Sequence, residues 1–359
     1  MLDFISQNLL AFIALLGIII FVHELGHFLA AKMFKMRVER FSIGFPPRLF
    51  GVQVGETDYC ISAIPFGGYV KIGGMVDESL DTEEMATEPE DWEFRAKPAW
   101  QQIIVMAAGV IFNFVLAIAI LAISYETPIF PETAIVGDIL ADKPAAQAGI
   151  MPNDEIFQID DTRINSWEDM VSVIQENPEN ELSLKLRRDG AVETLTLVPE
   201  AQPGQNGETV GKIGIVRKID RFEPVPLGES LVRATQQTYG ICVMTLASFG
   251  QMFTGEINWR ENVGGPIAIM KFAGETASSG YQDFFTLVAL LSITIGLINI
   301  LPFPALDGGH IFMILIEKIF RRELSLKVKI IVQQTGMLAL LCLMAVVLWN
   351  DVMKHVFNG

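Results

Sequence analysis

Residues 4–27 read FISQNLLAFIALLGIIIFVHELGH, and this stretch decides the architecture of the chain. Its first part, Phe4–Val22, carries no charged residue and is close to the roughly 20 apolar residues that a helix needs to cross a bilayer. It lacks a basic start and a small-residue cleavage site, so we do not expect a cleaved signal peptide. The span runs directly into His23-Glu24-Leu25-Gly26-His27. Ionisable groups within a membrane span are costly, so their presence here indicates a functional site.

The composition agrees with a membrane protein. The chain has 359 residues, of which 51% are hydrophobic and 19% charged, against roughly 25% charged in soluble domains. Three more stretches are long and free of charge, namely Pro98–Tyr125, Phe284–Leu301 and Ile330–Asn350. The net charge of −16 argues against nucleic acid as a partner, which needs a basic face. The three cysteines are too widely spaced for a disulfide framework or a zinc ribbon.

Basic residues beside the spans predict the orientation. Lysines and arginines flank the first two spans within 32–97 and fill the loop 317–329. The positive-inside rule places both loops in the cytoplasm, with both termini and the region 126–283 outside. Residues 234–255 are also uncharged, but a fifth span there would put the basic loop outside. We therefore expect 228–255 to form an amphipathic helix on the outer surface.

The predicted fold class is a polytopic α-helical membrane protein with four transmembrane helices. Residues 55–72 alternate in polarity and contain glycine-rich turns, which predicts a cytoplasmic-side β-hairpin or re-entrant region. Residues 77–93 carry nine acidic and no basic side chains, as is typical of a solvated linker. The predicted order is 1–31, first helix; 32–97, hairpin and acidic linker; 98–125, second helix; 126–206, outer domain; 207–283, return segment with the surface helix; 284–316, third helix; 317–329, basic loop; 330–350, fourth helix.

The spacing of the two histidines predicts a metal site. His23 and His27 lie four residues apart, so a helix presents both on one face, and Glu24 is placed to take a proton from a bound water. The alternative is two histidines satisfied in a helix interface beside a paired Glu24. A zinc hydrolase needs a third protein ligand. The segment after the histidines offers only glycine-rich strands and the acidic linker, so we look further along the chain.

The better third ligand is Asp307, in the stretch NILPFPALDGGH at 299–310. It ends an otherwise uncharged span, two prolines before it interrupt helical hydrogen bonding, and the glycines after it permit close backbone approach. Irregular backbone at membrane depth is tolerated only around a protein-lined or wet cavity. The alternative is that Asp307 caps the helix that follows.

The outer segment resembles a PDZ domain of the circularly permuted bacterial protease type. The resemblance rests on ADKPAAQAGIMPNDEI at 141–156, with Asn153 where glycine is usual. It implies an α+β domain in which an extended peptide adds to a sheet edge while a loop, expected at 135–138, holds its carboxylate. Residues 199–206 are predicted to be the exit linker of this domain.

Together, these motifs resemble the site-2 protease family of intramembrane zinc metalloproteases. The likeness extends to ERFSIGF at 39–45 and PFGGYVK at 65–71, and one PDZ domain is visible where the best-known members carry two. The resemblance implies Zn²⁺ as cofactor and assigns the following roles: His23, His27 and Asp307 as metal ligands, Glu24 as general base, Asn299 as a hydrogen-bond partner of the substrate backbone, and Gly109, Asn113, Gly308, Gly309 and His310 as supporting residues. The alternatives are a packing amide for Asn299 and simple helix packing for His310.

The resemblance also implies a function. The expected enzyme cuts single-span membrane proteins in the lipid of the bacterial inner membrane, as a multi-pass protein whose termini and PDZ domain lie outside. An anti-sigma factor, trimmed first outside the membrane during an envelope stress response, is the expected substrate, and remnant signal peptides are the second. An edge strand within 55–72 is expected to pair with the unwound substrate, so a proline that blocks strand pairing within 57–63 should sharply reduce cleavage. The alternatives are a non-catalytic, membrane-anchored PDZ scaffold and a metal transporter, although no repeated halves are visible.

Overall fold

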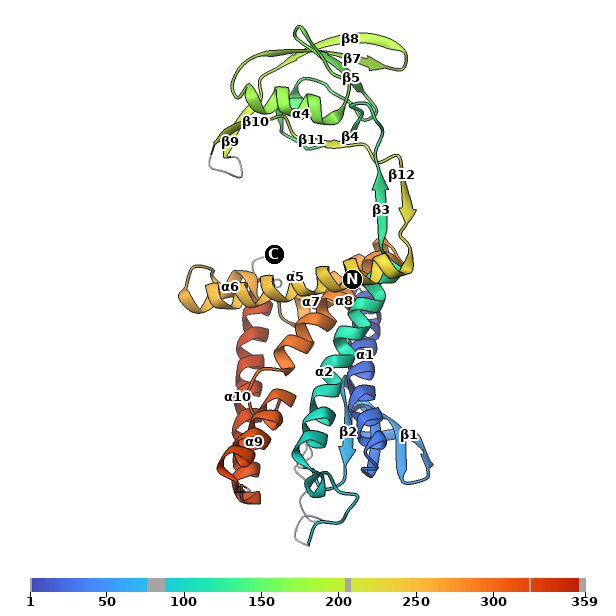
Figure 1. The fold of residues 1–359 in the computed structure, drawn as a ribbon, viewed down its shortest axis with the longest axis vertical. Coiled ribbons are helices and arrows are strands. Elements are labelled where there is room, and N and C mark those ends of the chain that lie inside the picture. The colour runs from blue at the N-terminus through green and yellow to red at the C-terminus, as the bar shows by residue number, and fades with distance from the viewer. Residues whose placement is uncertain (1, 76–87, 204–207, 323, 355–359) are drawn as a thin grey trace. The chain divides into compact units, whose positions relative to one another are not determined.

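The computed structural model describes residues 2–75, 88–203, 208–322 and 324–354, so most of the predicted acidic linker lies outside the described residues. The chain forms two compact units (Figure 1). The first comprises Met1–Ser124 with Leu227–Gly359, and the second comprises Tyr125–Pro226. Each unit is described separately below.

Four helices of the first unit are long and apolar enough to cross a membrane, in agreement with the four predicted spans. They are α1 (Leu2–Met33), α2 (Ala99–Ile123), α8 (Tyr281–Asn299) and α10 (Leu326–Val352). A short 3-10 turn, η2 (Phe94–Ala96), precedes α2. Small residues let α1 and α2 approach closely, since a Cβ atom at Gly26 would overlap the backbone carbonyl of Ala108. This contact holds the histidine end of α1 against α2.

The third predicted span, 284–316, is divided into α8 and α9 (Asp307–Phe320). Two prolines between them, Pro302 and Pro304, lack the N–H that a continuous helix requires. Ala305 has a φ of 77° in the left-handed region, so the chain turns back sharply there. Cβ atoms at Gly308 and Gly309 would overlap carbonyl groups of this loop. The break therefore folds tightly onto the first turn of α9.

Three further helices complete the first unit: α5 (Leu227–Thr254), α6 (Trp259–Asn262) and α7 (Pro266–Ser279). Helix α5 runs across the ends of α1 and α2 instead of alongside them (Figure 1). Ala234, Ile241 and Cys242 of α5 pack against apolar residues of α2 and α8. Helix α5 covers the segment 228–255, and its position on a membrane surface stays a prediction.

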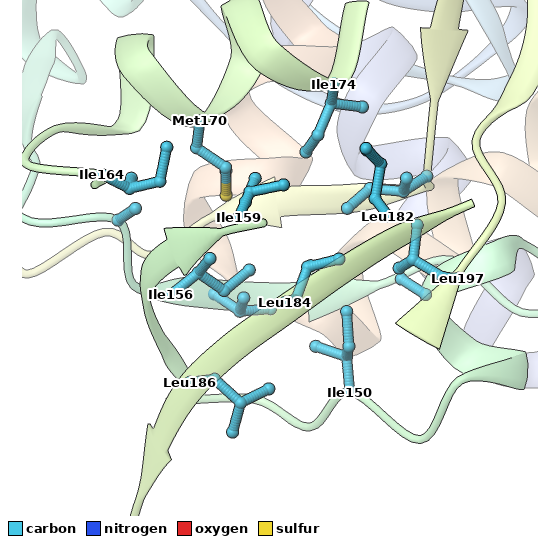
Figure 2. Packing of buried hydrophobic residues seen from close by; sticks show 14 residues of the cluster. Ile150, Ile156, Ile159, Ile164, Met170, Ile174, Leu182, Leu184, Leu186 and Leu197 are labelled. Atoms are coloured by element: carbon cyan, nitrogen blue, oxygen red, sulfur yellow. The ribbon is translucent and has the colours of Figure 1, made fainter. Parts of the chain in front are cut away.

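The second unit is an α+β domain around one apolar core. Its four-stranded sheet has the order β6-β5-β7-β8. Ile156, Ile159, Met170, Leu184 and Leu186 are almost completely buried between this sheet and α4 (Figure 2). Its elements are β3 (Glu126–Ile129), β4 (Val136–Ile139), α3 (Pro144–Gln147), β5 (Glu155–Ile159), β6 (Thr162–Arg163), α4 (Trp167–Glu176), β7 (Leu182–Arg188), β8 (Ala191–Leu197), β9 (Glu200–Pro203), β10 (Thr209–Lys212), β11 (Ile215–Arg217) and β12 (Arg221–Pro224).

Two predictions about this unit are wrong. The unit does not end at 206 through a linker at 199–206, because β9 pairs with β10, β11 with β4, and β12 with β3. The predicted carboxylate-binding loop at 135–138 largely forms strand β4, whose Val136 is fully buried. A cavity of about 370 Å³ lies instead between α4 and residues 211–215. Long-range strand pairing, which local composition does not report, decided both features.

In the sequence between α1 and α2, strands β1 (Val38–Val54) and β2 (Thr57–Ile72) form an antiparallel sheet. Each strand folds back on itself, so it contributes two rows to the sheet. Residues 58–61 pair on one side with 50–53 and on the other with 40–43. Residues 68–72 pair with 38–43 on one side only, within the part of the chain that the structure describes. The edge strand expected within 55–72 is therefore not at 57–63, because residues 58–61 lie inside the sheet. Among the described residues, 50–54 forms one edge of the sheet and 68–72, named the edge strand, forms the other.

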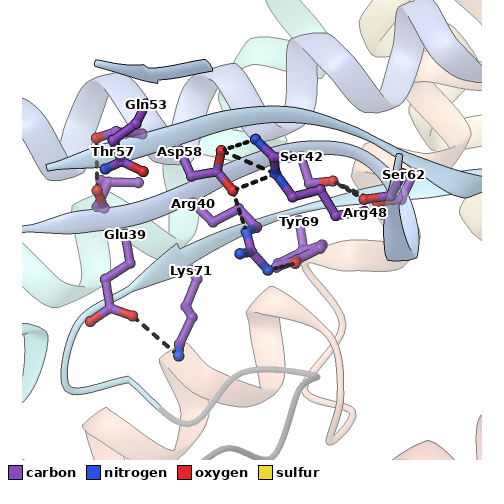
Figure 3. Close-up of polar contacts among 12 residues, drawn as sticks. Glu39, Arg40, Ser42, Arg48, Gln53, Thr57, Asp58, Ser62, Tyr69 and Lys71 are labelled. Carbon is purple, nitrogen blue, oxygen red and sulfur yellow. Dashed lines mark hydrogen bonds and ion pairs between the residues drawn. The ribbon is translucent and has the colours of Figure 1, made fainter. Parts of the chain in front are cut away.

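A polar network fixes the inner rows of this sheet (Figure 3). Asp58 accepts hydrogen bonds from Arg48 at 3.0 Å and from Arg40 at 3.1 Å. The hydroxyl groups of Ser42 and Ser62 lie 2.8 Å apart. The hydrogen bond from Arg48 holds the pKa of Asp58 below its usual value. These contacts stabilise the sheet to which the edge strand belongs.

Candidate metal centre

Helix periodicity places His23 and His27 on one face of α1, next to α2. Both side chains are buried, and their Nε2 atoms lie 3.2 Å apart. The two rings meet edge to face, with centroids 4.8 Å apart. Two imidazole nitrogens therefore point at one small volume.

Asp307 joins them from the first turn of α9. Its Oδ2 lies 3.2 Å from His23 Nε2, and its Oδ1 lies 3.4 Å from His27 Nε2. Leu306 is the N-terminal cap residue of α9, and no side-chain capping hydrogen bond is present there, so the alternative of Asp307 as a helix cap is not observed. The three residues are the one group of His, Cys, Asp and Glu side chains within the described ranges that could hold a metal ion.

The spacing of these donor atoms fits a metal. Tetrahedral zinc with bonds of about 2.0–2.1 Å separates its ligand atoms by roughly 3.3–3.4 Å. The two Nε2 atoms lie 3.2 Å apart, and each lies 3.2–3.4 Å from a different oxygen of Asp307. Asp307 Oδ2 is buried and has no hydrogen-bond partner among the described residues. Two histidines with one carboxylate is also a ligand set of catalytic zinc sites, which keep a fourth position for water. The residues present therefore fit a zinc ion.

Helix α2 supports both rings through one stripe of residues. The Nδ1 of His27 lies 2.7 Å from the backbone carbonyl oxygen of Val105. The Nδ1 of His23 lies 3.2 Å from the side-chain Nδ2 of Asn113. Midway between them, a Cβ atom at Gly109 would come within 2.7 Å of the His23 ring and would overlap His27. Spacings of four residues put all three on the face of α2 that meets α1.

A small cavity of about 50 Å³ adjoins the three ligands, which leaves room for a few water molecules. Glu24, Val70, Ile72, Met75 and Met106 complete its lining. The cavity therefore lies between Glu24 and the edge strand 68–72. A Cβ atom at Gly68 would lie 3.4 Å from Cγ of Glu24, so the strand passes directly over that carboxylic side chain.

Two further predicted site residues, Asn299 and His310, do not line this small cavity. Asn299 is the last residue of α8 and is half-buried. His310 lines a separate cavity of about 210 Å³, which it shares with Gln102 and Gln333. Sequence reasoning missed the contribution of Val105, because the backbone carbonyl acts there and no side-chain pattern marks it.

Known proteins are similar to this chain in sequence. Peptidase family M50 matches residues 11–343. A protein of Clostridium perfringens named as a zinc metalloprotease is 36% identical over 349 residues, which cover 97% of this chain and 98% of that protein. Regulator of sigma-W protease RasP of Bacillus subtilis is 27% identical and covers 97% and 99%. Regulator of sigma-E protease RseP of Escherichia coli is 30% identical and covers 96% and 98%.

Among solved structures, part of the chain is similar to the PDZ domain of an SdrC-like protein from Listeria monocytogenes. It is 21% identical, with a TM-score of 0.21, and covers 25% of this chain and 93% of that one.

Proposed function

The chain belongs to peptidase family M50, and from that premise we propose that His23, His27 and Asp307 hold its zinc ion while Glu24 serves as general base. The protein is a zinc-dependent intramembrane endopeptidase of the site-2 protease type. The observation that carries the residue assignment is the meeting of α1 and α9, which brings three donor atoms within 4.8 Å of one another. A scaffold without catalysis would have no need of that meeting.

The proposed chemistry divides between the metal and the chain. When bound, zinc supplies Lewis-acid polarisation of the scissile carbonyl and activates a water molecule. Glu24 then takes the proton of that water and passes it to the leaving amine, as general base and then general acid. The cavity beside Glu24 has a volume of about 50 Å³, so only a few water molecules can compete there.

The edge strand 68–72 is the proposed docking site for the substrate. A peptide bond within a helix can be attacked only after local unwinding, which leaves backbone N–H and C=O groups unpaired in a membrane. Pairing with a sheet edge restores those hydrogen bonds. Val70 and Ile72 of this strand line the same cavity as Glu24, so a segment paired there lies next to the metal ligands. Asn299 is proposed to hydrogen-bond the substrate backbone close to the cut.

The second unit is proposed to be a PDZ-like filter outside the membrane. Its cavity lies between α4 and 211–215, where an extended peptide could add beside β11. The proposed substrates are single-span membrane proteins already trimmed outside, an anti-sigma factor first and remnant signal peptides second. The printed names of the sigma-W and sigma-E protease relatives support the first choice. The proposed location is the bacterial inner membrane, with both termini outside.

Cleavage of a tagged single-span substrate without its outer domain tests this function. Wild type should cut it, and Glu24→Gln should lower the rate by about 10²–10⁴-fold while zinc stays bound. Glu56→Gln, at the exposed turn of the sheet, is the matched control and should cut normally. Equal cleavage by Glu24→Gln and wild type would contradict the general-base role. Restoring the outer domain of the substrate should suppress cleavage if the second unit acts as a filter.

A further inference from the structure

The two proposed histidine ligands differ in how α2 meets their second ring nitrogens. His27 turns Nδ1 to the carbonyl oxygen of Val105, which can only accept a hydrogen bond. The proton of neutral His27 therefore sits on Nδ1, and Nε2 presents its lone pair to the metal. His23 turns Nδ1 to the amide of Asn113, which offers both a donor and an acceptor. The orientation of the Asn113 amide therefore decides which ring nitrogen of neutral His23 carries the proton.

The amide of Asn113 is also incompletely satisfied. Its Nδ2 lies 3.2 Å from His23 Nδ1, while its Oδ1 is buried and has no hydrogen-bond partner among the described residues. If Nδ2 donates to Nδ1, the ring proton of neutral His23 must sit on Nε2, where it would block the metal. Rotating the amide by half a turn exchanges oxygen and nitrogen without moving the rest of the side chain. The oxygen then faces Nδ1 and gains a partner.

We propose that Asn113 is a positioning residue for the metal centre: with zinc bound, its amide oxygen accepts a hydrogen bond from Nδ1–H of His23. This inference rests on the proposed role of His23 as a ligand. The bond fixes the tautomer in which Nε2 carries a lone pair, as Val105 does for His27. Partners of this kind orient the ring and raise the basicity of the ligand.

The rest of the molecule holds Asn113 for this task. The side chain is completely buried, so no bulk water competes for His23 Nδ1. Ser292 of α8 donates a hydrogen bond of 2.9 Å to the backbone oxygen of Asn113. Gly109, one turn earlier, leaves space for both rings. One stripe of α2 thus supplies an acceptor at Val105, a gap at Gly109 and a second acceptor at Asn113, in the reverse of the order in which α1 presents its histidines.

The test is the zinc affinity of the full chain, measured by competition with a chelator, together with the visible spectrum of the cobalt-substituted protein. Asn113→Leu keeps the size of the side chain but removes the acceptor, and it should weaken zinc binding by about 10–100-fold and alter the cobalt spectrum. Asn113→Asp offers only acceptors and should retain wild-type affinity or exceed it. Thr294→Ala, on the same helix as Ser292, removes a hydroxyl group that bonds to the backbone oxygen of Leu290 and not to Asn113, and should leave both readouts unchanged.

Two results would overturn the proposal: wild-type affinity in Asn113→Leu, or a loss in Asn113→Asp as large as in Asn113→Leu. Recovery of affinity in Asn113→Asp also shows that a loss in Asn113→Leu is not a folding defect. His23→Ala separates this inference from the proposed function. If His23→Ala binds zinc as tightly as wild type, the ligand assignment itself is wrong. If only His23→Ala loses zinc, the ligand stands and Asn113 has no positioning role.

Discussion

Gly109 of α2 lies directly against the ring of His23 on α1, so that a Cβ atom on Gly109 would come within 2.7 Å of His23 Cε1. The same atom would overlap Nε2 of His27. The missing side chain is therefore a condition for the two proposed ligands to approach each other. It also explains why α2, which contributes none of the three proposed metal ligands, controls the geometry of the centre.

Gly109→Ala should weaken zinc binding by at least about tenfold, because the added methyl group displaces both imidazoles from their shared volume. Gly17→Ala is the matched control on α1, since a Cβ atom there meets nothing within 4 Å. Zinc content after dialysis against a chelator measures both variants. Unchanged zinc content in Gly109→Ala would contradict the close packing of α2 on the histidines.

Gly68→Ala should impair cleavage without releasing zinc. A Cβ atom there would lie 2.9 Å from the carbonyl oxygen of Ser42 on the neighbouring strand and 3.1 Å from Cγ2 of Ile20 on α1, so the edge strand must shift relative to both. A displacement of about 1 Å costs roughly 10²-fold in rate when it misplaces a bound substrate. The measurement is kcat/KM on a trimmed single-span substrate, with zinc content determined in parallel. A normal kcat/KM would argue against substrate pairing along 68–72.

Leu184→Ala should destabilise the second unit by about 2–5 kcal/mol, because Leu184 is fully buried in its core. Val192→Ala on the neighbouring strand is the control, since Val192 is 62% exposed. Hydrogen exchange of the full chain, followed over 125–226, measures the difference. Equal protection in the two variants would show that the core is not centred on Leu184.

Asp58→Asn should weaken the sheet at neutral pH but not at low pH. The arginine partners lower the folded-state pKa of Asp58, so its stabilising effect is present above the pKa of an unfolded aspartate and is lost as the pH falls through the lowered value. Hydrogen exchange of residues 38–72 at several pH values measures this. The wild-type and variant profiles should converge in acid, and a difference that persists at all pH values would contradict the ionic origin.

Some features follow from the sequence alone because they depend on neighbours a few residues apart. Long uncharged stretches predict the four spans, since the cost of a charge in lipid is local. The spacing of His23 and His27 places both on one helix face, whatever the rest of the chain does. The two prolines after Asn299 predict the break in the third span in the same way, because each removes its own N–H.

Only the tertiary structure decided which distant segments meet. Local pattern favoured an edge strand within 55–72, and strand pairing decides which part forms it: 58–61 is paired on both sides, whereas 68–72 is paired on one side only and lines the cavity through Val70 and Ile72. The outer domain extends to Pro226 because its last strands pair with its first. The contribution of Val105 is a backbone carbonyl, which every residue possesses. Which segments pair depends on the total free energy of hydrogen bonding and burial in each possible long-range pairing. A short stretch of sequence does not determine that total.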